Sequence, residues 1–203
     1  MGKTFDIARV RSDSELGEVG KFRYQCYLEE GLIEAKADQC FLDDYDFAPN
    51  AQIYTVTMDD RIVGTIRLHV LDHKNYESAT MAAFSDVLMP KIWSGMKLLD
   101  GARFAVAPDL GAVRLAVARQ TLRLYANFAE LNAVDYGVAA VADYRILVYH
   151  KLYGFSQISE PRQYADLSKE LVLMGVDLRE FKAQAIATGQ GAVYPLVRGQ
   201  MPH

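Results

Sequence analysis

Charged side chains interrupt three segments of this chain that otherwise have the composition of buried elements. Arg23 falls on the apolar stripe of a predicted amphipathic helix, and Arg67 falls within the strand pattern IVGTIRLHV. Asp100 and Arg103 interrupt the apolar run LLDGARFAV. An arginine cannot lose its charge, so a buried arginine requires an anionic partner. Any fold of this chain must therefore bring acidic side chains to these arginines.

The segment FLDDYDF, residues 41–47, is the best source of such partners, because its aspartates stand among aromatic and aliphatic side chains. We expect one internal polar cluster whose members are Arg23, Asp43, Asp46, Arg67, Asp100 and Arg103. A structural role explains any single buried pair equally well. Six charges from four segments favour a polar cleft, since buried charges gather where function requires them.

Hydrophobic patterning predicts an α/β or α+β fold with helices around one mixed sheet. Strands are expected at residues 4–10, 52–58, 62–71, 97–107, 136–142, 154–159 and 170–178, and helices at 12–32, about 81–88, 113–131, 144–153 and about 178–187. Ser12, Asp13 and Ser14 are candidate N-caps of the first helix and Gly31 can end it, while Gly154 is expected to be a left-handed cap.

Length and composition restrict the class of protein. The 203 residues suffice for one domain, which we expect to span residues 1–203. A formal net charge of −4 disfavours a broad nucleic-acid surface. The N-terminus is too charged for a secretory signal, and no apolar run approaches the roughly 20 residues of a membrane span. Cys26 and Cys40 form neither a CxxC pair nor a metal-ligand cluster, so we expect a cytoplasmic protein without a metal.

Four segments, in this order and spacing, resemble the autoinducer-synthase-like N-acyltransferases: FRYQCYLEEG, DDYD, GTIRLHV and DGARFAV. That group includes the acyl-homoserine-lactone synthases and the long-chain N-acyl amino acid synthases. The later stretch VAAVADYRILVYHKLYGF resembles the closing strand–helix–strand of the wider GNAT acetyltransferase fold. The resemblance covers roughly residues 5–177 and implies a GNAT-like mixed central sheet flanked by helices.

The resemblance also implies roles for the charged cluster. A first-helix arginine of the lactone synthases matches Arg23, and their D-x-Y-D pair matches Asp43 and Asp46, which leaves Asp44 facing solvent. In that family these residues order the N-terminal lobe and line the site where amine meets thioester. We therefore expect FLDDYDF to face Arg23 and one or both strand arginines, with the pKa values of its acids lowered by opposite charge.

Further matches and two departures concern the rest of the site. A strand arginine of the family matches Arg67, and a Glu-x-x-Arg motif matches Asp100 and Arg103, with the acid one methylene shorter. The lactone synthases also carry a tryptophan shortly after the first-helix arginine, whereas the only tryptophan here is Trp93. The stretches RYQCYLEEGLI and YDFAPNA are closer to the N-acyl amino acid synthases, which favours an amino acid over S-adenosylmethionine as amine donor.

The implied chemistry is amine acylation by a thioester, which requires a route for the amine proton and a donor for the oxyanion. Asp100 is the best candidate base, directly or through water, with Arg67 and Arg103 beside it; a structural partnership with Arg103 is the alternative. His69 lies on the face of Arg67, where a hydrogen-bonded structural role is the simpler interpretation. Asp100 and Arg103 would point to opposite faces of a regular strand, so we predict a β-bulge near Gly101 that brings them together.

The loop APDLGAVR contains one glycine, Gly111, and the acidic Asp109, which makes a poor cradle for the pyrophosphate of coenzyme A. Phosphopantetheine on an acyl carrier protein carries one phosphodiester charge and is the donor we expect, with acyl-coenzyme A as the alternative and no bound cofactor. Candidate docking residues for an acidic carrier protein are Arg114, Arg119, Arg123, Arg145 and Lys151, unless they are an ordinary solvated surface. Candidates for binding the acyl chain or phosphopantetheine are Phe104, Val106, Gly111, Arg114 and Tyr149, although the apolar ones are also compatible with plain core.

The favoured function is therefore acyl transfer from an acyl carrier protein thioester to an amino acid or a related small amine. Two alternatives remain open. One is an acyl-homoserine-lactone synthase that uses S-adenosylmethionine. The other is a non-catalytic acyl-binding module on the same fold, which would not need Asp100.

Overall fold

A computed structural model describes residues 5–179 of the chain. Its elements are β1 (Asp6–Arg9), α1 (Asp13–Glu29), β2 (Ala51–Met58), β3 (Arg61–Leu71), α2 (Ala79–Trp93), β4 (Leu98–Val106), α3 (Arg114–Leu131), β5 (Tyr136–Val141), α4 (Ile146–Tyr153), β6 (Ser156–Gln157) and β7 (Val172–Asp177). Short 3₁₀ helices are η1 (Asp44–Asp46), η2 (Pro108–Val113) and η3 (Asp143–Arg145). The predicted elements within this range are confirmed, and the helix expected at 178–187 lies almost wholly outside the described residues.

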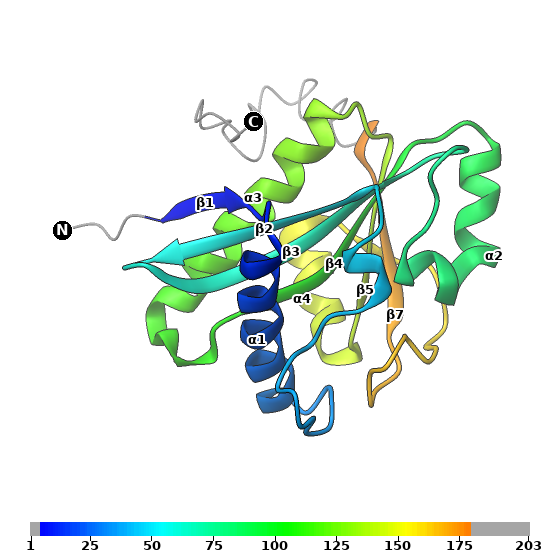
Figure 1. Cartoon of the computed structure of the whole chain (residues 1–203). Helices are drawn as coiled ribbons and strands as arrows, with labels where there is room; N and C mark the ends of the chain where they lie inside the picture. Colours follow the sequence, from blue (N-terminus) through cyan, green and yellow to red (C-terminus); the bar gives the residue numbers. More distant parts are fainter. Residues whose placement is uncertain (1–4, 180–203) are drawn as a thin grey trace.

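The strands form one mixed sheet in the order β1-β2-β3-β4-β5-β7-β6, which confirms the α+β prediction. The β4–β5 pair is parallel, and the pairs on either side of it are antiparallel. Helices α1 and α2 cover one face of the sheet, and α3 and α4 cover the other (Figure 1). The sheet therefore separates two layers of packing, and the charged cluster lies in the layer of α1 and α2.

Helix α1 begins and ends at the residues that its sequence indicates. Ser12 and Glu15 form a capping box at its start, and Gly31 follows its end with a φ of 64°. Helix α2 runs past the expected end at Leu88, through Pro90, as far as Trp93. Ile92 in this last turn is only 2% exposed, because its side chain packs into the core.

The predicted bulge is present, but it lies at Arg103 rather than at Gly101. Thr65 of β3 pairs with Ala105 and Arg67 with Ala102, so two residues of β4 oppose one of β3. Arg103 adopts a φ of 53°, the left-handed conformation typical of the first residue of some bulges. Gly101 cannot supply the extra residue, because it stays paired with Leu68 and its Cα packs on the ring of Tyr125.

Strands β4 and β5 pair only at their first residues, from Leu98–Tyr136 to Asp100–Val138. Beyond Asp100 the two strands no longer pair, and the bulge bends β4 at the same place. The fold thus opens the sheet beside Asp100 and Arg103.

Candidate active site

Arginines and aspartates from four elements form one buried cluster. Arg23 and Arg67 are 0% exposed and Arg103 is 4% exposed. Arg23 Nη1 donates to Asp46 Oδ1 at 2.7 Å, and Arg67 Nη1 lies 2.9 Å from the same oxygen. The contact predicted between Arg23 and an acid of FLDDYDF is therefore confirmed.

Asp43 joins the two strand arginines. Its carboxylate accepts from Arg67 Nη1 at 2.5 Å and from Arg103 through Nε at 3.1 Å and through Nη2. The bulge therefore turns Arg103 to the face that carries Arg67, and the ring of Phe41 stacks 4.3 Å from its guanidinium carbon. Asp44 is exposed, as expected.

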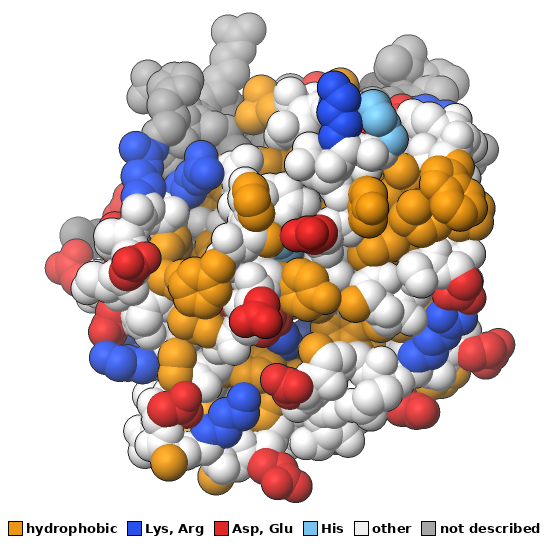
Figure 2. Space-filling view, turned by 45° about the vertical axis from the view of Figure 1, so that its right-hand side comes forward, with side chains coloured by type: hydrophobic (Ala, Val, Ile, Leu, Met, Phe, Trp, Pro, Cys, Tyr) orange, Lys and Arg blue, Asp and Glu red, His pale blue; other side chains and the backbone are white. Residues whose placement is uncertain are grey.

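The cluster keeps both acids ionised. Burial alone would raise the pKa of Asp46, but the charges of Arg23 and Arg67 outweigh it and hold that pKa below its usual value. Burial also acts to raise the pKa of Asp43, but the charges of Arg67 and Arg103 outweigh it and lower that pKa as well. On the face in Figure 2, acidic and apolar side chains lie in the middle among white atoms, and most lysine and arginine side chains lie toward its edges.

Asp100 does not pair with Arg103, although both lie on this side of the sheet. Its Oδ1 accepts from Thr80 Oγ1 at 2.8 Å, and Tyr164 lies 2.9 Å from the same hydroxyl. Thr80 has one proton and gives it to Asp100, so the Tyr164 hydroxyl is the donor in the second bond. Asp100 Oδ2 is fully buried and has no hydrogen-bond partner among residues 5–179.

His69 stands directly opposite Asp100 across the β3–β4 ladder, so their side chains share a face. Its Nε2 lies 3.1 Å from the carbonyl oxygen of Tyr45, which can only accept, so Nε2 carries the proton. Nδ1 then holds a free lone pair, and no group in the described part of the chain donates to it. Burial lowers the pKa of His69, and this effect outweighs the charge of Asp100, which alone would raise that pKa. The ring is therefore neutral at pH 7.

A groove of about 470 Å³ runs from the opened edge of β4 between α3 and α4. It is lined by Glu30, Phe104, Val106, Arg114, Leu115, Ala118, Leu122, Tyr144, Arg145, Val148, Tyr149 and Tyr153. Most of this lining is apolar, and burial raises the pKa of Tyr149 to about 12, so the phenol stays neutral. Phe104, Val106, Arg114 and Tyr149 thus come together as predicted, whereas Gly111 is not among the lining residues.

The remaining basic candidates differ in exposure. Arg119 and Lys151 are exposed, and Arg123 is half-buried and donates to Gln120 at 3.1 Å. Asp109, whose charge is the reason to expect a poor pyrophosphate cradle, forms a two-pronged pair with Arg61, with both distances at 2.8 Å. The carboxylate at the groove is that of Glu30, which sequence reasoning missed together with Thr80 and Tyr164.

Within residues 5–179, no group of three or more His, Cys, Asp or Glu side chains is arranged to hold a metal ion.

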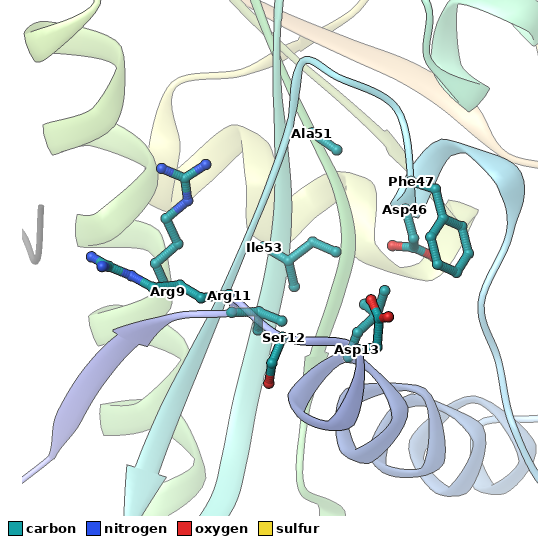
Figure 3. Close-up of a pocket in the computed structure, with 10 residues that line it drawn as sticks. Arg9, Arg11, Ser12, Asp13, Asp46, Phe47, Ala51 and Ile53 are labelled. Atoms are coloured by element: carbon teal, nitrogen blue, oxygen red, sulfur yellow. The ribbon is translucent and has the colours of Figure 1, made fainter.

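A second cavity of about 460 Å³ lies at the start of α1 and is lined by Val10, Asp13, Leu16, Phe47 and Ile53, among others. Figure 3 shows Phe47 beside Asp46 at one end, while the side chains of Arg9 and Arg11 extend away from that carboxylate. The lining residues include neither Asp100 nor the strand arginines. This cavity therefore meets the cluster only at Asp46.

A bulged central strand, an opened β4–β5 pair and a groove between α3 and α4 define an acyltransferase of GNAT-like fold. A family profile described as N-acyl amino acid synthase FeeM matches residues 18–177, and the chain belongs to that family. A search of curated protein sequences found no match.

Solved structures support the same fold. FeeM, an N-acyl amino acid synthase from uncultured soil microbes, superposes with a TM-score of 0.74 at 15% identity and covers 94% of this chain and 100% of its own. The acyl-homoserine-lactone synthase LasI gives a TM-score of 0.64 at 18% identity and covers 87% of this chain and 91% of its own. The coenzyme A-dependent lactone synthase BjaI, solved with SAM and isopentyl-CoA, gives a TM-score of 0.58 at 14% identity and covers 93% of this chain and 92% of its own.

No helix within residues 5–179 is both long and apolar enough to cross a membrane.

Proposed function

We propose that this protein transfers a fatty acyl group from an acyl carrier protein thioester to the amine of an amino acid or a related small amine. The proposal places the reaction in the cytoplasm, in keeping with the free Cys26 and Cys40, and within a single domain spanning residues 1–203. Family membership supports the acyl transfer itself.

The observation that carries the proposal is the pair of unpartnered acceptors, Asp100 Oδ2 and His69 Nδ1. An amine reaches the enzyme mainly as an ammonium ion, and two protons must leave its nitrogen before the amide is complete. One leaves before the nitrogen attacks the thioester carbon, and the other leaves as the C–N bond forms and the C–S bond breaks. The expelled thiolate takes back one proton, and the second goes to solvent.

Two buried acceptors on one face suit this sequence of steps, because an ammonium ion can donate to both at once. Asp100 is the proposed base; Thr80 donates to its carboxylate, and Tyr164 in turn donates to the Thr80 hydroxyl and holds it in place. Arg67 and Arg103 supply positive charge on the same face. Positive charge there suits the oxyanion of the tetrahedral intermediate.

The groove supports a phosphopantetheine arm as the donor. Its apolar lining suits a pantetheine and acyl chain, and Arg114 and Arg145 stand at its polar end. Exposed Arg119 and Lys151 suit an acidic carrier protein, with acyl-coenzyme A as the alternative donor.

The test combines a product screen with Asp100→Asn. Purified protein is incubated with carrier protein thioesters of several chain lengths and the protein amino acids, and products are identified by mass spectrometry. We expect N-acyl amino acids, and a loss of about 100- to 10,000-fold in turnover for Asp100→Asn with the fold retained. The control is Asp44→Asn on the exposed side of the same cluster.

No amide product from any donor would overturn the proposed function. Turnover of Asp100→Asn within about threefold of the wild type, far below the usual contribution of a general base, would leave Asp100 as a structural partner of Thr80.

A further inference from the structure

The polar end of the groove holds a carboxylate in an unfavourable place. Glu30 is the C-cap residue of α1, where the helix carries partial negative charge and a cation is favoured. Arginines from two other elements compensate for this. Glu30 Oε1 accepts from Arg114 Nη2 at 3.1 Å, and Oε2 accepts from Arg145 Nη2 and from the Tyr144 hydroxyl at 3.4 Å.

Without Glu30, these three donors would form a site for an external anion. A guanidinium binds phosphate oxygens with the same geometry as carboxylate oxygens. Arg114 and Arg145 line the groove together with Glu30, and the lining around them is apolar. A donor whose acyl and pantetheine arm lies in the groove would therefore bring its phosphate to the oxygen positions that Glu30 occupies.

We propose that Glu30 takes the place of the donor phosphate in the empty enzyme and selects among acyl donors by their charge. The proposal rests on the proposed function in one respect, namely that the donor is a phosphopantetheine thioester bound in this groove. Asp109 does not contribute, because its charge is paired with Arg61 outside the groove.

The sum of charges gives the direction of selection. Arg114, Arg145 and Glu30 together carry one net positive charge, which matches the single phosphodiester of a carrier-bound arm. Coenzyme A adds a second phosphate in its pyrophosphate and a third on its ribose, and the Glu30 carboxylate repels this additional charge. Glu30 therefore favours the carrier protein donor over coenzyme A.

Glu30→Gln tests the proposal, because it keeps the size of the side chain and removes its charge. One acyl chain is presented on pantetheine without phosphate, on the carrier protein and on coenzyme A, and kcat/KM is measured for each. We expect a gain of about tenfold for the coenzyme A thioester, a smaller gain for the carrier protein and none for pantetheine. High salt should reduce the gain. Glu29→Gln is the matched control, since Glu29 is exposed one residue earlier.

Binding measurements separate this inference from the proposed function. Calorimetric titration with coenzyme A needs no turnover, and Glu30→Gln should bind it about tenfold more tightly while its affinity for pantetheine is unchanged. Arg145→Gln, which removes a cation, should shift the ratio of the two affinities in the opposite direction. Equal effects on both ligands, or no effect on either, would overturn the role of Glu30. If the affinities shift as expected but no amide forms from any donor, the proposed function fails, and the part of this inference that stands is the discrimination by Glu30 among phosphate-bearing ligands.

Discussion

Asp46→Asn is the most direct test of the buried cluster, because the chain offers a matched control two residues earlier. Asp46 accepts from Arg23 at 2.7 Å and lies 2.9 Å from Arg67, and all three side chains are 0% exposed. Asp44 belongs to the same 3₁₀ helix but is exposed. Within residues 5–179, the ion pairs give Arg23 no other carboxylate, so the substitution leaves a buried guanidinium without its counter-charge.

The size of the effect follows from this burial. Removing one partner of a buried ion pair costs about 3–5 kcal/mol in the free energy of unfolding. For a domain of this length, each kcal/mol shifts the melting temperature by about 2–4 °C, so Asp46→Asn should melt about 6–20 °C below the wild type. Asp44→Asn should stay within about 0.5 kcal/mol of the wild type.

Urea unfolding at pH 7 and at pH 4 and below provides the assay. The pKa of Asp46 is lowered in the folded state, because the charges of Arg23 and Arg67 outweigh the effect of burial. Its contribution to stability is therefore fully present above the unfolded pKa of about 3.9 and is lost as the pH falls through the folded pKa. The gap between the wild type and Asp46→Asn should narrow below about pH 4. A loss under about 1 kcal/mol at pH 7, or an equal loss for Asp44→Asn, would refute the reasoning.

Three further outcomes are expected. His69→Gln keeps a donor for the Tyr45 carbonyl and replaces the basic ring nitrogen with an amide oxygen that accepts hydrogen bonds but is not a base. Turnover should therefore fall by about 100-fold or more with the fold retained, whereas a purely structural histidine predicts near-normal turnover. Gly101→Ala should cost about 1–3 kcal/mol in urea unfolding, because its Cβ would lie 2.7 Å from a tyrosine ring of α3; Gly17→Ala, with nothing within 4 Å, should instead gain about 0.5–1 kcal/mol. Charge reversal at Arg119 and Arg123 should weaken use of a carrier protein donor and its salt dependence, and unchanged kinetics would exclude this surface from docking.

The sequence predicts the fold and the ion cluster because both follow from strong local rules. Hydrophobic periodicity locates the strands and helices, and the permanent charge of Arg23 and Arg67 demands acidic partners. FLDDYDF offers those acids among apolar neighbours, and the structure confirms their contacts with both arginines. The odd spacing of Asp100 and Arg103 also predicts that β4 is irregular, since a regular strand would place them on opposite faces.

Details that depend on packing between distant segments cannot be predicted from the sequence by these local rules. The bulge lies at Arg103 rather than at the glycine, because Gly101 is needed where the Tyr125 ring meets the strand. Tyr164 approaches Thr80 from a distant loop, and no periodic pattern marks that approach. In the sequence, Glu30 has no feature that distinguishes it from a surface residue at a helix end. Only the folded structure shows the two arginines beside it.

Charge balance connects the stability of the cluster with the proposed chemistry. Arg23, Arg67 and Arg103 carry three positive charges, and the two buried acids of FLDDYDF carry two negative charges. The carboxylate of Asp100 brings this buried set to neutrality. In the proposed reaction, Asp100 would accept a proton from the amine, and the set would gain one net positive charge just as negative charge develops on the thioester oxygen and then on sulfur. Because the groups are shielded from water, that change would act strongly on the reacting atoms. The arginines that require acidic partners for folding would thus also stabilise the transition state of the proposed reaction.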